Sequence, residues 1–265
     1  MQTIKFRLKT GDKNYGEVYL PDEFTGRLPV IIYCHGGGMG CAGNVWGYSA
    51  AARDHAVQNG MAFATFDCFA GGKTGGDYGK MTYGRWADNL IGVMDWLAAQ
   101  DYINPERIGA LGISCGSTTA LRAAAKGAKL YFLSSVASCT TVHVGMWGQG
   151  GAAKCFVDNL NALLAGERAM LFGVAFEKEF FLDDISNAPV HALLENQVAC
   201  PVLFQQGAAD NVFRCSDARL AYDIMHRANL PAKYIEYPEG KHDLDNVAEQ
   251  AAADLFAWLA EISFI

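Results

Sequence analysis

The sequence predicts a single α/β domain, residues 1–265, in which a mostly parallel β-sheet is covered by helices on both faces. Short runs of apolar residues recur along the chain, and such runs are typical of strands that are buried on both faces. Stretches with helical periodicity separate these runs, which favours parallel strands joined by crossover helices. Hydrophobic residues make up 51% of the chain and charged residues 18%, so the composition supports a sizeable core and excludes a disordered class.

The expected strands begin with an antiparallel hairpin. Residues 3–9 and 15–20 alternate apolar and polar side chains around a turn at Thr10, Gly11 and Asp12. The strands of the parallel part follow as nearly continuous apolar runs. We expect them at residues 29–34, 61–66, 107–113, 130–137, 201–205 and 234–237.

Five helices are expected at residues 44–59, 85–98, 117–126, 216–229 and 247–261. The first ends before Gly60, which is a favourable C-terminal cap. The second has its apolar side chains on one face, as helical spacing requires. For the fourth, Ser216 is the expected N-cap.

Residues 138–199 interrupt this alternation. The segment shows no clear strand and is rich in Gly, Phe and Met. It is too long for a simple connection, and no linker marks it as a separate domain. We therefore expect it to be an insertion that lies on the sheet and forms a lid.

The bulk charge and the cysteine pattern limit the setting and the partners. The formal net charge is −7, which argues against nucleic acid or an anionic membrane as a partner. The N-terminus lacks the apolar core of a signal peptide, and no apolar run approaches about 18 residues. The eight cysteines form no CxxC pair, so we expect a cytoplasmic protein with free thiols; a disulfide remains the alternative.

The first chemical motif is Gly112-Ile-Ser114-Cys-Gly116, which fits the G-x-S-x-G nucleophile elbow. The elbow holds a serine on a sharp turn between a strand and a helix, and the glycines leave room for that turn. An expected strand precedes the motif and an Ala-rich helix follows it, which is the context that the motif needs. The alternative is an ordinary glycine-rich turn at the end of a strand.

A second motif, His35-Gly36-Gly37-Gly38, directly follows the expected strand at residues 29–34. Glycines let the backbone approach a substrate oxygen closely and donate N–H groups to it. We expect the oxyanion hole to be the N–H groups of Gly37 and Cys115; a flexible turn is the alternative. His35 itself is expected to brace the loop, because a catalytic base this early contradicts the usual order of a triad.

That order is serine, then acid, then histidine. Asp210 directly follows the expected strand at residues 201–205, and His242 follows the strand at residues 234–237. Ligand sites of open α/β sheets lie at these carboxyl ends. The predicted triad is Ser114, His242 and Asp210, although Asp210 also suits a turn and His242 a surface loop. Asp243 and Asp245 are expected to begin a helix.

The order of these motifs along the chain is the order found in the α/β-hydrolases, and the chain resembles that superfamily over nearly its full length. Within it, the chain most resembles the cinnamoyl (feruloyl) esterases and the dienelactone-hydrolase-like esterases. Residues 66–76, Phe-Asp-Cys-Phe-Ala-Gly-Gly-Lys-Thr-Gly-Gly, are similar to a glycine-rich loop of that family, with Ala70 and Gly71 where Gly-His is usual. The resemblance implies a serine esterase with a lid after the sixth strand.

The predicted chemistry is hydrolysis of a small-molecule carboxylic ester through an acyl-enzyme, with no metal or cofactor. Aromatic (cinnamoyl-type) and short acyl groups are the candidates. The alternatives are a peptidase or thioesterase with the same triad, or a catalytically silent binding protein. The insertion should supply the acyl pocket, for which the candidates are Met146, Trp147, Phe172 and Phe176. The sequence leaves the oligomeric state open.

Overall fold

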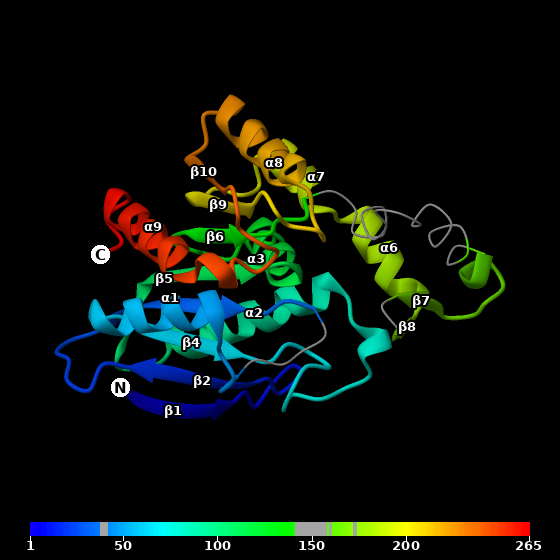
Figure 1. The fold of residues 1–265 in the computed structure, drawn as a ribbon. Helices are drawn as coiled ribbons and strands as arrows, with labels where there is room; N and C mark the ends of the chain where they lie inside the picture. Colours follow the sequence, from blue (N-terminus) through cyan, green and yellow to red (C-terminus); the bar gives the residue numbers. More distant parts are fainter. Residues whose placement is uncertain (38–41, 141–157, 159–160, 172–173) are drawn as a thin grey trace.

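The computed structural model describes residues 1–37, 42–140, 158, 161–171 and 174–265. Within these residues an eight-stranded sheet has the order β1-β2-β4-β3-β5-β6-β9-β10 (Figure 1). The expected α/β architecture is confirmed. The strands are β1 (Gln2–Arg7), β2 (Tyr15–Leu20), β3 (Leu28–Cys34), β4 (Ala62–Phe66), β5 (Ile103–Ile113), β6 (Leu133–Val136), β9 (Val202–Gly207) and β10 (Ala232–Tyr237).

The sheet is parallel except at one edge. β1 and β2 form the expected antiparallel hairpin, and β2 then pairs antiparallel with β4. From β4 through β3, β5, β6 and β9 to β10, every neighbouring pair is parallel. The carboxyl ends of these six strands therefore lie along one edge of the sheet, and the loops that follow them can converge there.

Helices cover both faces of the sheet and enclose two separate apolar clusters (Figure 1). One face carries α1 (Gly47–Gln58) and α9 (Ala248–Glu261), which contact each other. The other carries α2 (Tyr83–Ala98), α3 (Cys115–Ala125) and α8 (Cys215–Arg227). The central strands β3, β4 and β6 are buried on both faces, which explains their nearly continuous apolar sequences.

Two local expectations were wrong. Arg214 is the N-cap of α8, with no side-chain capping bond, so Ser216 lies inside the helix. The segment 138–199 also contains strands, because β7 (Ala169–Leu171) pairs antiparallel with β8 (Val174–Phe176). Each strand is only three residues long, too short for the alternation that identifies a strand in a sequence. Two helices follow in the segment, α6 (Lys178–Ser186) and α7 (Pro189–Leu194).

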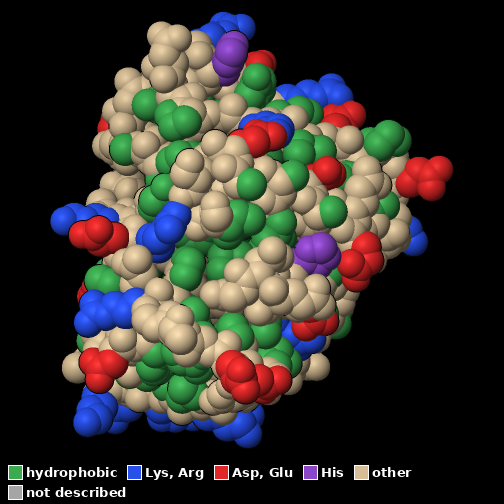
Figure 2. Space-filling view, turned by 90° about the vertical axis from the view of Figure 1, so that its left-hand side faces the viewer, with side chains coloured by type: hydrophobic (Ala, Val, Ile, Leu, Met, Phe, Trp, Pro, Cys, Tyr) green, Lys and Arg blue, Asp and Glu red, His purple; other side chains and the backbone are tan. Residues whose placement is uncertain are grey.

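Figure 2 shows the end of the molecule that faces left in Figure 1. Lys and Arg side chains are interspersed there with Asp and Glu, and neither sign dominates the face. Among the described residues, no helix is both long enough and apolar enough to cross a bilayer. Six of the eight cysteines are described as free thiols, namely Cys34, Cys68, Cys115, Cys139, Cys200 and Cys215.

Candidate active site

Ser114 lies at a strained turn between β5 and α3. Its backbone has φ 56° and ψ −121°, a conformation that residues other than glycine rarely adopt. The strand ends one residue before it and the helix begins one residue after it. Its N–H donates to the Val136 carbonyl of β6 at 2.9 Å, so the turn is tied to the sheet while the side chain is half-buried.

The two glycines of the motif are required by close backbone approach. A Cβ on Gly112 would collide with the backbone of Gly116, and a Cβ on Gly116 would collide with the carbonyl group of Cys34 at the end of β3. The backbone of the turn therefore packs closely against itself and against the end of β3. Only glycine fits at these two positions, which is the physical basis of the sequence pattern.

The glycine loop after β3 lies beside the elbow. A Cβ on Gly36 would lie 3.6 Å from the Cβ of Ser114, and one on Gly37 would lie 3.1 Å from the Sγ of Cys115. The helix expected from residue 117 begins two residues earlier, at Cys115. The N–H of Cys115 is therefore one of the first-turn donors that have no partner within an α-helix, and it lies at the positive end of the helix dipole.

Asp210 and His242 come together from two loops at the carboxyl edge of the sheet. Asp210 follows β9 and His242 follows β10, and these strands are neighbours. The Nδ1 of His242 lies 2.9 Å from the Oδ2 of Asp210. The Asp210 side chain is fully buried and the His242 side chain is 24% exposed. A neutral imidazole that donates from Nδ1 keeps Nε2 as an acceptor.

The Asp210 carboxylate is surrounded by donors. Its Oδ1 accepts from the backbone N–H groups of Val212 and Phe213, at 2.7 and 3.0 Å. Its Oδ2 accepts from His242 and from the amide of Gln206. Burial raises the pKa of Asp210, but the hydrogen bond and charge of His242, with the two backbone donors, outweigh it and hold the pKa below its usual value. The carboxylate is therefore ionised at neutral pH.

A cavity of about 230 Å³ lies at the carboxyl edge of the sheet. Ser114 and His242 both line it, together with Gly36 and Gly37. The sequence did not indicate several other lining residues, which are Tyr33, Trp46, Ser49, Asp243 and Asp245. No spacing or motif in the sequence connects residues 46–49 with residues 243–245, so only the folded chain could reveal this wall.

Asp245 begins a helix, as expected, and has a second role. It is the first residue of the short 3-10 helix η2 (Asp245–Val247), and its Oδ1 also accepts from the N–H of Tyr48 at 2.9 Å. It therefore satisfies a donor in the first turn of α1. Burial, and secondarily the neighbouring Asp243, raise the pKa of Asp245 despite the bond from Tyr48.

His35 occupies the position expected of a loop brace. It is 2% exposed, its Nδ1 lies 2.7 Å from the Gly36 carbonyl, and its Nε2 accepts from the Cys68 N–H at 3.0 Å. These two contacts require a neutral ring that donates from Nδ1. Burial lowers the pKa of His35 and outweighs its bond to the Gly36 carbonyl. The ring thus links the glycine loop to the loop after β4.

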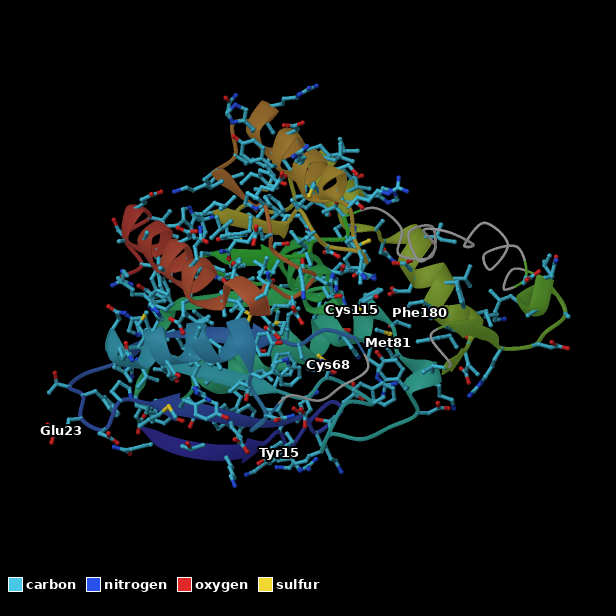
Figure 3. The ribbon with its side chains drawn as sticks, in the orientation of Figure 1. Tyr15, Glu23, Cys68, Met81, Cys115 and Phe180 are labelled. Atoms are coloured by element: carbon cyan, nitrogen blue, oxygen red, sulfur yellow. The ribbon has the colours of Figure 1, made fainter. Side chains whose placement is uncertain are left out.

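The residues expected to line an acyl pocket are placed only in part. Met146, Trp147 and Phe172 lie outside the described residues. Phe176 is 2% exposed and its ring packs against Tyr78 and Phe180, with centroids at 5.6 and 4.5 Å. Phe180 belongs to the same buried cluster as Cys68, Met81 and Cys115, and Figure 3 shows these four where α6 meets the core. The contribution of Phe176 to a substrate pocket remains a prediction.

No metal site is evident in the part of the chain that the structure describes, since no group of three or more His, Cys, Asp or Glu side chains is arranged to hold an ion there. The arrangement that is present consists of a strained serine, a histidine–carboxylate pair and a helix N-terminus beside a glycine loop. These are the groups needed for acyl transfer.

Comparisons with known proteins show the family of the chain and its fold. The model of the prolyl oligopeptidase family (Peptidase_S9) matches residues 46–263. No curated protein matches the chain. Among solved structures, Est1E from Butyrivibrio proteoclasticus is 15% identical with a TM-score of 0.74, covering 98% of both chains. The same protein with bound ferulic acid is 17% identical with a TM-score of 0.75, covering 97% of this chain and 99% of that one. The acylaminoacyl peptidase of Pyrococcus horikoshii is 16% identical with a TM-score of 0.73, covering 98% of this chain and 41% of its own.

Proposed function

Because the chain belongs to the prolyl oligopeptidase family, a family of serine hydrolases with the α/β-hydrolase fold, we propose that it cleaves carboxylic esters by acyl transfer. In this proposal Ser114 is the nucleophile, His242 is the general base and Asp210 is the orienting acid. The observation that carries it is the bond of 2.9 Å between His242 and Asp210, with His242 and Ser114 lining one cavity.

The first half-reaction forms an acyl-enzyme. The Nε2 of His242 takes the Ser114 hydroxyl proton as Oγ attacks the ester carbonyl, and the ionised Asp210 stabilises the resulting imidazolium. The carbonyl oxygen becomes an oxyanion, and the N–H groups of Gly37 and Cys115 donate to it. The imidazolium then gives its proton to the departing alcohol.

The second half-reaction uses the same groups with water as the nucleophile. His242 removes a proton from water, which attacks the acyl-enzyme carbonyl. Collapse of the second tetrahedral intermediate releases the acid and returns the proton to Ser114. Every proton is carried by His242, and no redox step or cofactor is needed.

The support for an ester of an aromatic acid comes from Est1E, whereas the family model that matches the chain is that of a peptidase family. Est1E and this chain superpose over nearly the whole of both, and one Est1E structure contains ferulic acid. The peptidase of Pyrococcus horikoshii is matched over less than half its length. Within the proposed function, the segment 138–199 acts as a lid that sets acyl specificity, and Phe176 lies in its described part.

A substrate panel tests the choice of bond and acyl group. We expect the kcat/KM of a feruloyl or other cinnamoyl ester to exceed that of the matching anilide and of a dipeptide anilide, with acetyl and butyryl esters also cleaved. A fluorophosphonate probe should label Ser114 in parallel. A higher kcat/KM for peptide anilides or acyl thioesters would replace the ester proposal with the peptidase or thioesterase alternative, and a protein that the probe does not label would be a silent binder.

A further inference from the structure

Gln206 contacts the carboxylate that orients the proposed base. It is the penultimate residue of β9 and is fully buried. Its Nε2 lies 2.9 Å from the Oδ2 of Asp210. The same oxygen lies 2.9 Å from the Nδ1 of His242. Two side-chain donors, one from β9 and one from the loop after β10, therefore converge on one carboxylate oxygen.

The orientation of the Gln206 amide follows from its neighbours. Its Nε2 also lies 3.2 Å from the Gly207 carbonyl, so both nearby groups are acceptors and the NH2 group must face them. Its Oε1 is buried and has no hydrogen-bond partner among the described residues. A buried acceptor without a partner destabilises the fold. Stability alone would therefore favour an apolar side chain here, and the benefit of an amide must lie in its contact with Asp210.

The preceding residue makes an informative contrast. Gln205 is also fully buried, but its side chain extends from the other face of β9, as alternation along a strand requires. Its Nε2 donates to the Tyr237 hydroxyl at 2.7 Å and to the Ala251 carbonyl at 2.9 Å. Its Oε1 accepts from the hydroxyl groups of Tyr48 and Ser134. All of these contacts connect β9 with α1, α9 and the neighbouring strands, and none reaches Asp210 or His242.

We propose that Gln206 is a positioning residue for catalysis, whose amide holds the Asp210 carboxylate in the plane that directs Oδ2 at His242. This inference rests on the proposed triad and adds a fourth member to it. Without the amide donor, the carboxylate keeps its two backbone donors on Oδ1 but can rotate about them, so the imidazole is less firmly oriented. Gln206 does not line the cavity, so substrate binding should not depend on it.

The test compares Gln206→Met with Gln205→Met, since methionine matches glutamine in length and cannot donate. For Gln206→Met we expect kcat to fall about ten-fold, as for loss of one hydrogen bond to a charged group. KM should stay within about two-fold of the wild type, because Gln206 makes no contact with the substrate.

The acid limb of the kcat/KM profile should move to higher pH, because a carboxylate with fewer donors attracts the imidazolium proton more strongly. Gln205→Met should lose thermal stability and keep the wild-type kcat and pH profile. Rates are divided by the phosphonate titre, so that only folded enzyme is counted.

A second variant, Gln206→Glu, keeps the shape and, at a pH at which the new carboxyl group is ionised, replaces the donor with an acceptor beside Asp210. Its kcat should fall further than that of Gln206→Met, and this variant decides the matter if the methionine variant does not fold. Wild-type kcat and pH profile in the folded Gln206 variants, or an equal loss of kcat in Gln205→Met, would overturn the inference. If the phosphonate labels Ser114 in that case, the proposed triad still stands; failure of labelling in the wild type would instead refute the proposed function.

Discussion

The guanidinium of Arg122 on α3 donates two hydrogen bonds to the carboxylate of Asp183 on α6, each at 2.6 Å. The same carboxylate accepts from the N–H of Gly84, in the first turn of α2, at 3.0 Å. The Arg122 side chain is only 8% exposed. This ion pair therefore fixes the inserted segment to the helix that begins directly after Ser114.

Removal of the acid from this pair should destabilise the protein strongly. Asp183→Ala leaves a nearly buried guanidinium without its partner, and we expect the free energy of unfolding to fall by about 3 kcal/mol. Urea denaturation measures the loss, and limited proteolysis should cut the segment 138–199 faster. Arg168→Met is the matched control, because Arg168 binds Asp77 and Glu177 on the exposed surface of the same region. Equal stability losses in the two variants would contradict the anchoring role.

Ser114→Ala should reduce kcat by about 10⁴-fold or more on any ester that the wild type cleaves. The variant should fold and retain the wild-type melting temperature within a few degrees, because the half-buried serine contributes little packing. Cys115→Ala is the informative neighbour. If only the backbone N–H of Cys115 is used, this variant stays active; a kcat loss as large as that of Ser114→Ala would point to the thiol as the nucleophile.

Asp210→Asn should lower kcat by about 10⁴-fold, since an amide does not hold the imidazole in the required tautomer. Stability provides an independent check. The folded-state pKa of Asp210 lies below its unfolded value of about 3.9, so ionised Asp210 stabilises the fold above that pH. The stabilisation is lost as pH falls through the folded-state pKa. Denaturation at several pH values should therefore show the wild type more stable than Asp210→Asn at pH 7, with a gap that closes below about pH 4.

His35 should make the fold sensitive to mild acid. Its folded-state pKa lies below the unfolded value of about 6.5, so between these values the unfolded chain binds one more proton than the native protein. The contribution of neutral His35 to the free energy of unfolding is fully present above about pH 6.5. Below that pH the free energy of unfolding falls, with a slope of at most about 1.4 kcal/mol per pH unit. His35→Asn should remove this slope in denaturation experiments between pH 7 and 5. His226→Asn, which changes an exposed histidine, is the control and should keep the slope. A slope that is unchanged in His35→Asn would exclude His35 as the source of the pH dependence.

Phe176→Ala tests the link between the insertion and acyl specificity. Because Phe176 fills a buried site between Tyr78 and Phe180, we expect a stability loss of about 3 kcal/mol or more. Relative kcat/KM values should also change among aromatic, short-chain and long-chain esters, while a small phosphonate still labels Ser114. Equal losses across all esters and the phosphonate would indicate a structural brace without a role in selectivity.

Several features of this protein follow from local sequence alone. The central parallel strands are recognisable as short apolar runs because both of their faces are covered, whereas the edge strand β10 is only half-buried. Gly112 and Gly116 stand out because close backbone contact leaves no room for a Cβ. Asp210 and His242 could be singled out because each follows a strand of the parallel sheet, and the parallel order brings the ends of these strands to one edge.

Other features were decided by the tertiary structure. Arg122 and Asp183 are 61 residues apart, and Tyr48 and Asp245 are 197 residues apart, so no local pattern connects either pair. Gln205 and Gln206 have the same chemistry and adjacent positions, yet one supports the packing of α1 and α9 while the other contacts Asp210. Their difference depends on which face of β9 each side chain takes and on what the rest of the chain places there. Local sequence determines which groups can react, because backbone strain and strand burial are short-range constraints. The partners of each group depend on long-range packing, which only the complete fold establishes.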